Sequence, residues 1–181
     1  MTPAPPTQTA TVRPARPSDV RHIRALVEPY AQRRILVEKE AVAYYESVQE
    51  FVVAEAGAAE TGPTDQPRLV GCGALHVMWE DLAEIRTLAV APEMHGSGLG
   101  HALVDELLAR ARTLGLRRVF CLTFEVDFFV RHGFHEIEGT PVDPAVYAEL
   151  LRSHDDGIAE FLDLARVKPN TLGNSRMLIE L

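Results

Sequence analysis

The chain has 181 residues, enough for one domain with a full hydrophobic core, and its 46% hydrophobic and 24% charged residues indicate an ordinary soluble globular protein. The net charge of -8 argues against a nucleic-acid partner, because binding a phosphate backbone requires a basic surface. The sequence has neither a stretch of membrane-spanning length nor the pattern of a signal peptide, which predicts a cytoplasmic protein that does not bind a membrane.

The first half of the chain is predicted to combine short helices with strands. Residues 1–10, rich in Pro, Thr and Ala, are expected to be a disordered tail, so the folded domain would span residues 11–181. A helix is expected to begin at Pro17 and to end or kink at Pro29. Strands are predicted at residues 11–15, 51–55, 69–79 and 83–90, a second helix at 40–48 and a long hairpin loop at 57–67.

The second half alternates helix and strand. Helices are predicted after the glycine-rich turn as far as Gly115, at 127–133 and at 144–153, strands at 118–123, 134–138 and 176–181, and a polar loop at 168–175. Because the strand 118–123 follows the strand 83–90 through a helix, the two are expected to be parallel neighbours in one sheet. The pattern predicts an α/β (α+β) fold.

The glycine-rich turn after the strand 83–90 is the strongest functional signal. Gly96, Gly98 and Gly100 alternate, so the backbone can curl and point several N–H groups into one concavity at a helix N-terminus, which favours a phosphate group. A P-loop is excluded because His101, and not Lys, follows the last glycine. A dinucleotide-binding loop is excluded because no third glycine stands at the required spacing.

The turn resembles the acetyl-coenzyme A loop of the GNAT acetyltransferases. The resemblance rests on the strand end Val90-Ala91-Pro92 and on the loop 95–100, in which His95 stands where the family has Arg or Gln. It implies a mixed, mostly antiparallel sheet with a central splayed pair of parallel strands, flanked by helices, and acetyl-CoA as cosubstrate without a metal ion. The residues that it implies for cofactor binding are Leu88, Ala89, Val90, His95, Gly96, Ser97, Gly98, Leu99, Gly100 and His101.

A more specific resemblance is to the acetyltransferase domain of N-acetylglutamate synthases. The matching segments lie at residues 28–30, 35–37, 51–55, 71–75, 83–86, 119–123 and 128–129. The resemblance implies acetylation of L-glutamate in arginine biosynthesis, by direct transfer in a ternary complex, and is compatible with a homodimer. Glu38 keeps L-glutamine open as the substrate. The alternatives are another amine, such as a protein N-terminus or an antibiotic, and a non-catalytic acyl-CoA-binding regulatory module.

Acetyl transfer to an amine needs a base for the ammonium, a polarised carbonyl and a stabilised thiolate. The resemblance assigns the base to Glu84, in the apolar strand before the turn; the alternative is a carboxylate that only pairs with Arg86. Thr123 stands where the synthases have a hydroxyl residue and is given a hydrogen-bonding role, the alternative being a strand-end Thr that satisfies the backbone. Cys72 and Cys121 lie in apolar runs and are expected to be buried free thiols.

A glutamate acceptor carries two carboxylates, each of which needs a cation or several hydrogen-bond donors. Candidate substrate-binding residues occur in the connector 33–39, beside the candidate base and next to the last loop. They are Arg34, Leu36, Lys39, Arg86 and Arg176.

Overall fold

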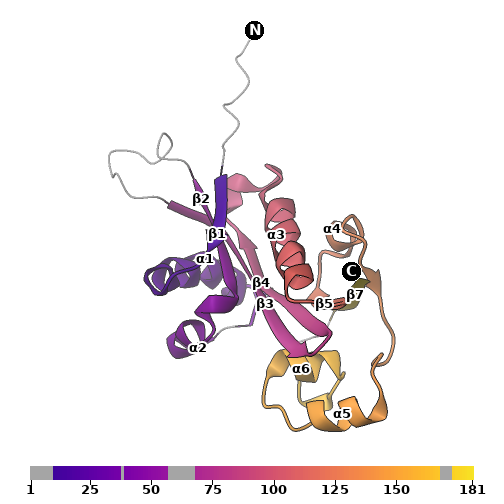
Figure 1. The fold of residues 1–181 in the computed structure, drawn as a ribbon. Helices are drawn as coiled ribbons and strands as arrows, with labels where there is room; N and C mark the ends of the chain where they lie inside the picture. Colours follow the sequence, from indigo (N-terminus) through magenta and orange to yellow (C-terminus); the bar gives the residue numbers. More distant parts are fainter. Residues whose placement is uncertain (1–9, 38, 57–67, 168–172) are drawn as a thin grey trace. The chain divides into compact units, whose positions relative to one another are not determined.

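The structure, a computed structural model, describes residues 10–37, 39–56, 68–167 and 173–181 (Figure 1). The chain divides into two compact units. The first contains the described residues up to Gly73 together with Thr87–Glu106, and the second contains Ala74–Arg86 together with Leu107–Leu181. The predicted tail at 1–9 and the predicted hairpin loop at 57–67 lie outside the described residues.

The first unit begins with strand β1 (Ala10–Pro14), so Ala10 belongs to a strand and not to the expected tail. Its other elements are the short 3-10 helices η1 (Pro17–Asp19), η2 (Val48–Glu50) and η3 (Pro92–Met94), the helices α1 (Val20–Gln32) and α2 (Ala41–Glu46), and strand β2 (Phe51–Ala56). Strands β1 and β2 pair antiparallel, with Val12 opposite Ala54. The unit also contains one part each of β3 (Arg68–Trp79), β4 (Leu82–Val90) and α3 (Leu99–Thr113).

Helix α1 continues through Pro29 to Gln32, so of the two expectations, an end or a kink at Pro29, the end is wrong. A proline in the last turn removes one backbone hydrogen bond, whereas the apolar stripe of the helix stays buried. Val20, Ile23 and Val27 recur on one face and are each at most 2% exposed. Burial of this face outweighs the local preference of proline to end a helix.

The second unit contains the remaining parts of β3, β4 and α3. It continues with β5 (Arg118–Thr123), α4 (Val126–Val130), β6 (His135–Glu136), α5 (Pro144–Leu150), α6 (Asp156–Phe161), η4 (Ala165–Val167) and β7 (Ser175–Glu180). Figure 1 shows α5 and α6 next to each other, in orange and yellow. Helix α6 was not predicted, and β6 is shorter than the strand expected at 134–138.

The strands are hydrogen-bonded in the order β1-β2-β3-β4-β5-β7-β6. Strands β4 and β5 are parallel, as predicted, whereas β7 is antiparallel to both β5 and β6. The parallel ladder joins Leu82–Glu84 to Arg118–Phe120, and β5 then continues to Thr123 along β7 alone. Within the described residues, β4 and β5 therefore separate after Glu84, which confirms the expected splay of the parallel pair.

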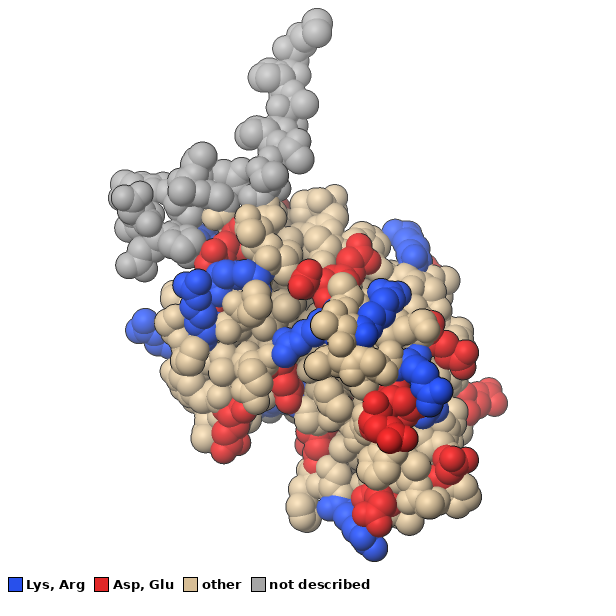
Figure 2. Space-filling view, viewed as in Figure 1, with Lys and Arg blue, Asp and Glu red and all other residues tan. Residues whose placement is uncertain are grey.

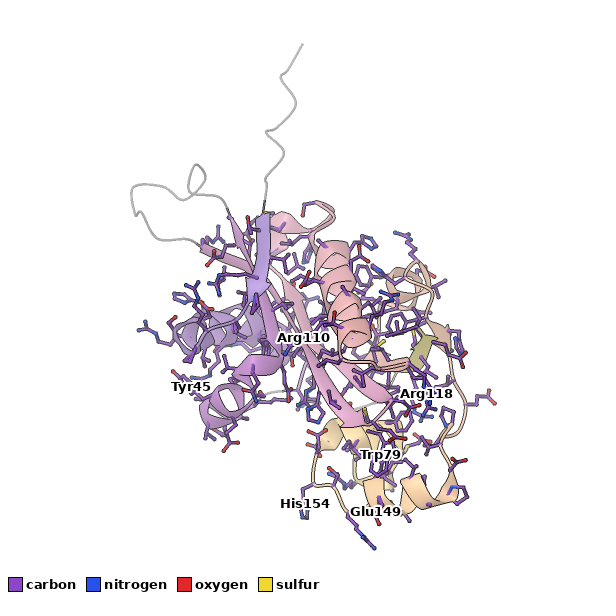
Figure 3. The ribbon with its side chains drawn as sticks, in the orientation of Figure 1. Tyr45, Trp79, Arg110, Arg118, Glu149 and His154 are labelled. Atoms are coloured by element: carbon purple, nitrogen blue, oxygen red, sulfur yellow. The ribbon has the colours of Figure 1, made fainter. Side chains whose placement is uncertain are left out.

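The hydrophobic core of the second unit places α6 beside β4. Phe161 of α6 packs edge to face on Phe120 of β5, with ring centroids 5.3 Å apart, and both side chains are fully buried. Leu82 of β4 and Ile158 of α6 belong to the same cluster, and Trp79, labelled in Figure 3, packs against it. A buried apolar contact of this kind fixes the polar groups at the start of α6 close to β4.

Charged side chains of both signs cover the face drawn in Figure 2, where Lys and Arg are interspersed with Asp and Glu. In the part of the chain that the structure describes, no helix is long and apolar enough to cross a membrane.

Candidate active site

The glycine-rich turn of the first unit has the curled backbone conformation that its alternating glycines predict. Gly96 and Gly98 have φ angles of +78° and +86°, a region that side chains disfavour. A Cβ atom built on either residue would have no protein atom within 4 Å, so both residues face open space. The first hydrogen bond of α3 runs from Ala102 N to Gly98 O (3.1 Å), which makes Gly98 the last residue before the helix.

Ser97 fixes the shape of this turn. Its hydroxyl donates to Met94 O (2.6 Å) and accepts from the backbone N–H of Leu99 (3.3 Å). Helix α3 begins directly after this turn, and the N-terminus of a helix favours negative charge. The turn therefore has the backbone form and the polarity that suit a pyrophosphate group.

His95, which stands where the acetyltransferase pattern has Arg or Gln, contacts α1 and the end of β4. Its Nε2 atom lies 3.0 Å from the hydroxyl of Tyr30 in α1 and 3.2 Å from Val90 O at the end of β4. The Tyr30 hydroxyl also donates to Val90 O, and burial raises the pKa of Tyr30. The His95 side chain therefore ties the turn to the strand end, and its role in cofactor binding stays a prediction.

Strand β4 contains a residue with unusual backbone angles just before the predicted carbonyl-binding segment 88–90. Thr87 has a φ angle of +56°, which is rare for a β-branched residue and marks local strain. The buried Cys72 thiol donates to Thr87 O (3.6 Å), which helps to hold this conformation. Thr87 directly precedes the segment whose N–H groups the family resemblance expects to face the acetyl group.

In the second unit, Glu84 and Arg86 form an acid–base pair on β4. The two residues alternate with Ile85 and so share one face of the strand. Glu84 is 3% exposed, and its Oε2 atom lies 3.8 Å from Arg86 Nη1. A Cβ atom added to Gly157 would lie 1.9 Å from Glu84 Oε2, so the start of α6 packs directly on the carboxylate.

Asp155, which sequence reasoning did not single out, completes this cluster. Its Oδ2 atom accepts a hydrogen bond from Arg86 Nη1 at 2.9 Å and lies 3.8 Å from His76 Nε2. Burial opposes the charge of Asp155, but the positive charge of Arg86 and the bonds from Arg86 and from the N–H of Ile158 lower the pKa of this carboxyl group. The only sequence signal for it was an acidic residue ahead of an apolar run, which is typical of a helix N-cap.

A model of the acetyltransferase (GNAT) family matches residues 21–136 of the chain. The chain belongs to this family. It is 61% identical to the amino-acid acetyltransferase of Mycobacterium tuberculosis, over 94% of this chain and 94% of that protein.

Two solved structures bear on the fold of this GNAT member. A Mycobacterium tuberculosis protein, solved in complex with CoA and NLQ, is 59% identical, with a TM-score of 0.85 over 94% of this chain and 99% of that chain. The N-acetylglutamate synthase of Neisseria gonorrhoeae, complexed with coenzyme A and N-acetyl-glutamate, gives a TM-score of 0.72 at 23% identity, over 96% of this chain and 35% of that chain. These likenesses confirm the predicted GNAT fold, an acetyltransferase as the enzyme class and acetyl-CoA as the cosubstrate.

The glycine turn of this GNAT chain fits acetyl-CoA. The cosubstrate carries a pyrophosphate, and the open concavity at Gly96 and Gly98 would accept it without a side chain in the way. Gly96, Ser97, Gly98, Leu99, Gly100 and His101 would hold it through the turn and the first helical turn.

Thr123 makes the backbone hydrogen bond that was expected if it had only a structural role, and it remains a candidate catalytic residue. Its side chain is buried, and its Oγ1 atom accepts a hydrogen bond from Glu125 N at 2.9 Å. A hydroxyl that accepts one bond can still donate its own proton. The structure therefore shows the backbone-satisfying role, and the role of Thr123 in catalysis stays a prediction.

The candidate substrate-binding residues occur in both units. Arg86 lies beside Glu84, whereas the Arg176 guanidinium donates to the carbonyls of Glu160 (3.2 Å) and Phe161 in the last turn of α6. Burial lowers the pKa of Arg176. Arg34, Leu36 and Lys39 belong to the first unit, in the connector between α1 and α2, where Arg34 is exposed and the other two are half-buried.

The two cysteines are free thiols and are buried, as predicted. Burial raises the pKa of Cys72 to about 12. Burial, and then the charge of Glu84, raises the pKa of Cys121. Since the thiolate is the nucleophilic form of cysteine, neither residue is suited to carry an acetyl group at neutral pH. This favours direct transfer between the two substrates.

Proposed function

We propose that this GNAT enzyme transfers the acetyl group of acetyl-CoA to the α-amine of L-glutamate or of its neutral analogue L-glutamine, by direct transfer in a ternary complex. The observation that carries the proposal is the Glu84–Arg86 pair, a buried carboxylate and a guanidinium on one face of β4 with 3.8 Å between them. The 61% identity to a protein named amino-acid acetyltransferase supports the same acceptor class.

An α-amino acid has the complementary pair of charges. Its ammonium and carboxylate groups are attached to the same carbon, so a binding site needs an anion and a cation a few ångströms apart. The planar guanidinium of Arg86 matches the geometry of a carboxylate, and its Nη1 atom bonds Asp155. A simple amine has no carboxylate and could not form this interaction with the guanidinium, which favours an amino acid as the acceptor.

The reaction follows from these groups. Glu84, directly or through one water molecule, takes a proton from the bound ammonium, and the nitrogen lone pair attacks the thioester carbonyl carbon. The new C–N bond forms and the C–S bond breaks. The nitrogen gives up its second proton, and the thiolate of coenzyme A leaves and takes up a proton. The family resemblance assigns the stabilisation of the oxyanion to backbone N–H groups of the segment 88–90, and makes the Thr123 hydroxyl the candidate donor toward the departing sulfur.

The side chain of the acceptor separates glutamate from glutamine. A glutamate side chain brings a second carboxylate and would need a second cation, for which Arg34, Lys39 and Arg176 are the candidates. A glutamine side chain needs only neutral donors and acceptors. Acetylation of glutamate would place the enzyme in arginine biosynthesis.

The test is an acceptor screen. Release of the coenzyme A thiol from acetyl-CoA is followed with each of the twenty amino acids and with a set of simple amines, and the product is identified by mass spectrometry. We expect the highest kcat/KM for glutamate or glutamine, with the acetyl group on the α-nitrogen. Turnover of simple amines alone would refute the proposal, and tight binding of acetyl-CoA without turnover of any amine would favour a regulatory module.

A further inference from the structure

The segment that leads into α6 closes on the Glu84–Arg86 pair from a position 69 residues away in the sequence. Asp155 is fixed there at four atoms. Its Oδ1 atom caps α6 by accepting from Ile158 N (3.1 Å), its N–H donates to Ser153 Oγ (3.1 Å), and its carbonyl accepts from Arg166 Nη2 (3.1 Å). The remaining oxygen, Oδ2, accepts from Arg86.

Because its two carboxylate oxygens bind different partners, Asp155 is a rigid hydrogen-bond acceptor. One carboxylate oxygen holds the start of the helix, and the other holds the guanidinium, so neither can turn without breaking the other contact. Arg86 is held in turn, because a charge-assisted hydrogen bond of 2.9 Å restricts a side chain that otherwise has many rotamers. The Arg86 side chain is 14% exposed, so little water competes for it.

We propose that Asp155 is a positioning residue for acetyl transfer: it holds Arg86 at a fixed place beside Glu84, and its charge balances that of Arg86 so that Glu84 can exchange a proton with the acceptor amine. This inference rests on the proposed function, because it takes Glu84 as the base and Arg86 as the group that binds the acceptor carboxylate.

Charge balance is the part of the inference that an experiment can isolate. Both Glu84 and Asp155 lie within 3.8 Å of the same nitrogen, Arg86 Nη1. Among the described residues, His76 of β3 lies 3.8 Å from Asp155 and adds charge only when protonated, and Arg166, which pairs with Asp156, bonds the Asp155 carbonyl. The Cys121 thiol of β5 also faces Glu84, and burial raises its pKa. Removing one charge of the Asp155–Arg86 pair therefore leaves the other uncompensated next to Glu84.

The two single removals act in opposite directions. In Asp155→Asn, the uncompensated guanidinium would hold the ionised form of Glu84 more strongly, so the acidic limb of the kcat/KM profile moves to lower pH. In Arg86→Gln, the uncompensated Asp155 carboxylate would favour the protonated form of Glu84, so the acidic limb moves to higher pH. Charges at this range in a partly buried site shift the limb by about one pH unit.

The variant Asp155→Asn separates this role from the folding of α6. Asparagine is as good an N-cap as aspartate, so the bond from Ile158 N can persist. The matched control is Asp156→Asn, which removes the same charge one residue later, from an exposed pair with Arg166. We expect Asp156→Asn to leave the profile at its wild-type position.

The experiment measures kcat, KM for the amino-acid acceptor and KM for acetyl-CoA from pH 5 to 9 for the wild type, the three variants and Glu84→Gln, with thermal melting as the check on folding. We expect opposite limb shifts in the Asp155 and Arg86 variants, and about a tenfold rise in acceptor KM in Asp155→Asn with acetyl-CoA KM unchanged. Equal shifts in one direction, or no shift in either variant, would overturn the inference. Wild-type turnover by Glu84→Gln would instead refute the proposed base, so the two failures are distinguishable.

Discussion

Replacing Gly157 by alanine is predicted to damage catalysis through Glu84 and not through the fold. A Cβ atom at this position would lie 1.9 Å from Glu84 Oε2, 2.8 Å from Cδ and 3.0 Å from Oε1. Since Cβ contacts shorter than 3.0 Å essentially never occur, the carboxylate and α6 must move apart by at least 1.1 Å. Alanine is the better helix former, by about 1 kcal/mol, so helix propensity opposes any loss of stability.

A displacement of about 1 Å at a catalytic group can cost a hundredfold in rate. We therefore expect kcat/KM of Gly157→Ala to fall about a hundredfold, while the overpacking lowers the free energy of unfolding by about 1 to 2 kcal/mol and acetyl-CoA binding persists. The assay is a double-mutant cycle with Glu84→Gln. If the alanine acts on the carboxylate, the double variant is no slower than Glu84→Gln alone. Independent, multiplicative losses would refute this reasoning, as would wild-type activity in Gly157→Ala.

Two further predictions concern the glycine-rich turn and the ion pairs of Arg13, both in the first unit. Gly98→Ala should weaken the binding of coenzyme A, measured by calorimetry, at least tenfold. Gly115→Ala is the control, because Gly115 has a similar φ angle of +79° and open space at its Cβ, so both variants carry the backbone strain but only Gly98 faces the proposed pyrophosphate site. Gly115→Ala should bind normally, and equal affinities of the two variants would contradict the assignment of the loop. Arg13 bonds the carboxylates of Asp19 and Glu55, and its hydrogen bond is the main cause that lowers the pKa of Asp19 below the ordinary value of 3.8. That stabilisation is present above pH 3.8 and is lost as the pH falls through the lowered pKa. Arg13→Gln should therefore lower the free energy of unfolding, measured in urea, by about 2 kcal/mol at pH 7 and by progressively less below pH 4. A difference between variant and wild type that does not depend on pH would show that the ion pairs are not its cause.

The parts of the site that depend on neighbouring residues in the sequence could be predicted. The alternating glycines predicted the backbone of the turn, because a positive φ angle is a local requirement that glycine meets. Glu84 was assigned because it lies in an apolar strand just before that turn and because the segment 83–86 resembles that of the synthases. The order of strands and helices indicated the parallel pair β4–β5, since a helix between two strands favours a parallel crossover.

The contacts made across long sequence separations could not be predicted. Asp155 reaches Arg86 only because α6 packs through Phe161 on β5. A helix of six residues is too short to be predicted from the periodicity of its apolar residues. The bond between Tyr30 and His95 joins residues 65 apart, and nothing in the sequence around either residue indicates the other. Arg176 was expected at the substrate because it is a cation beside a loop. Two of its nitrogens bond carbonyls of α6, which only the tertiary fold brings near.

In the proposed reaction, Glu84 removes the proton from the acceptor amine. The direct measurement compares Glu84→Gln with Glu80→Gln, a control at an exposed glutamate in the turn between β3 and β4, at saturating acetyl-CoA and amino acid. A general base contributes about a hundredfold or more, so kcat of Glu84→Gln should fall by at least that factor while the Kd for acetyl-CoA is unchanged, and Glu80→Gln should match the wild type. A Glu84→Gln enzyme that turns over at the wild-type rate would contradict the account.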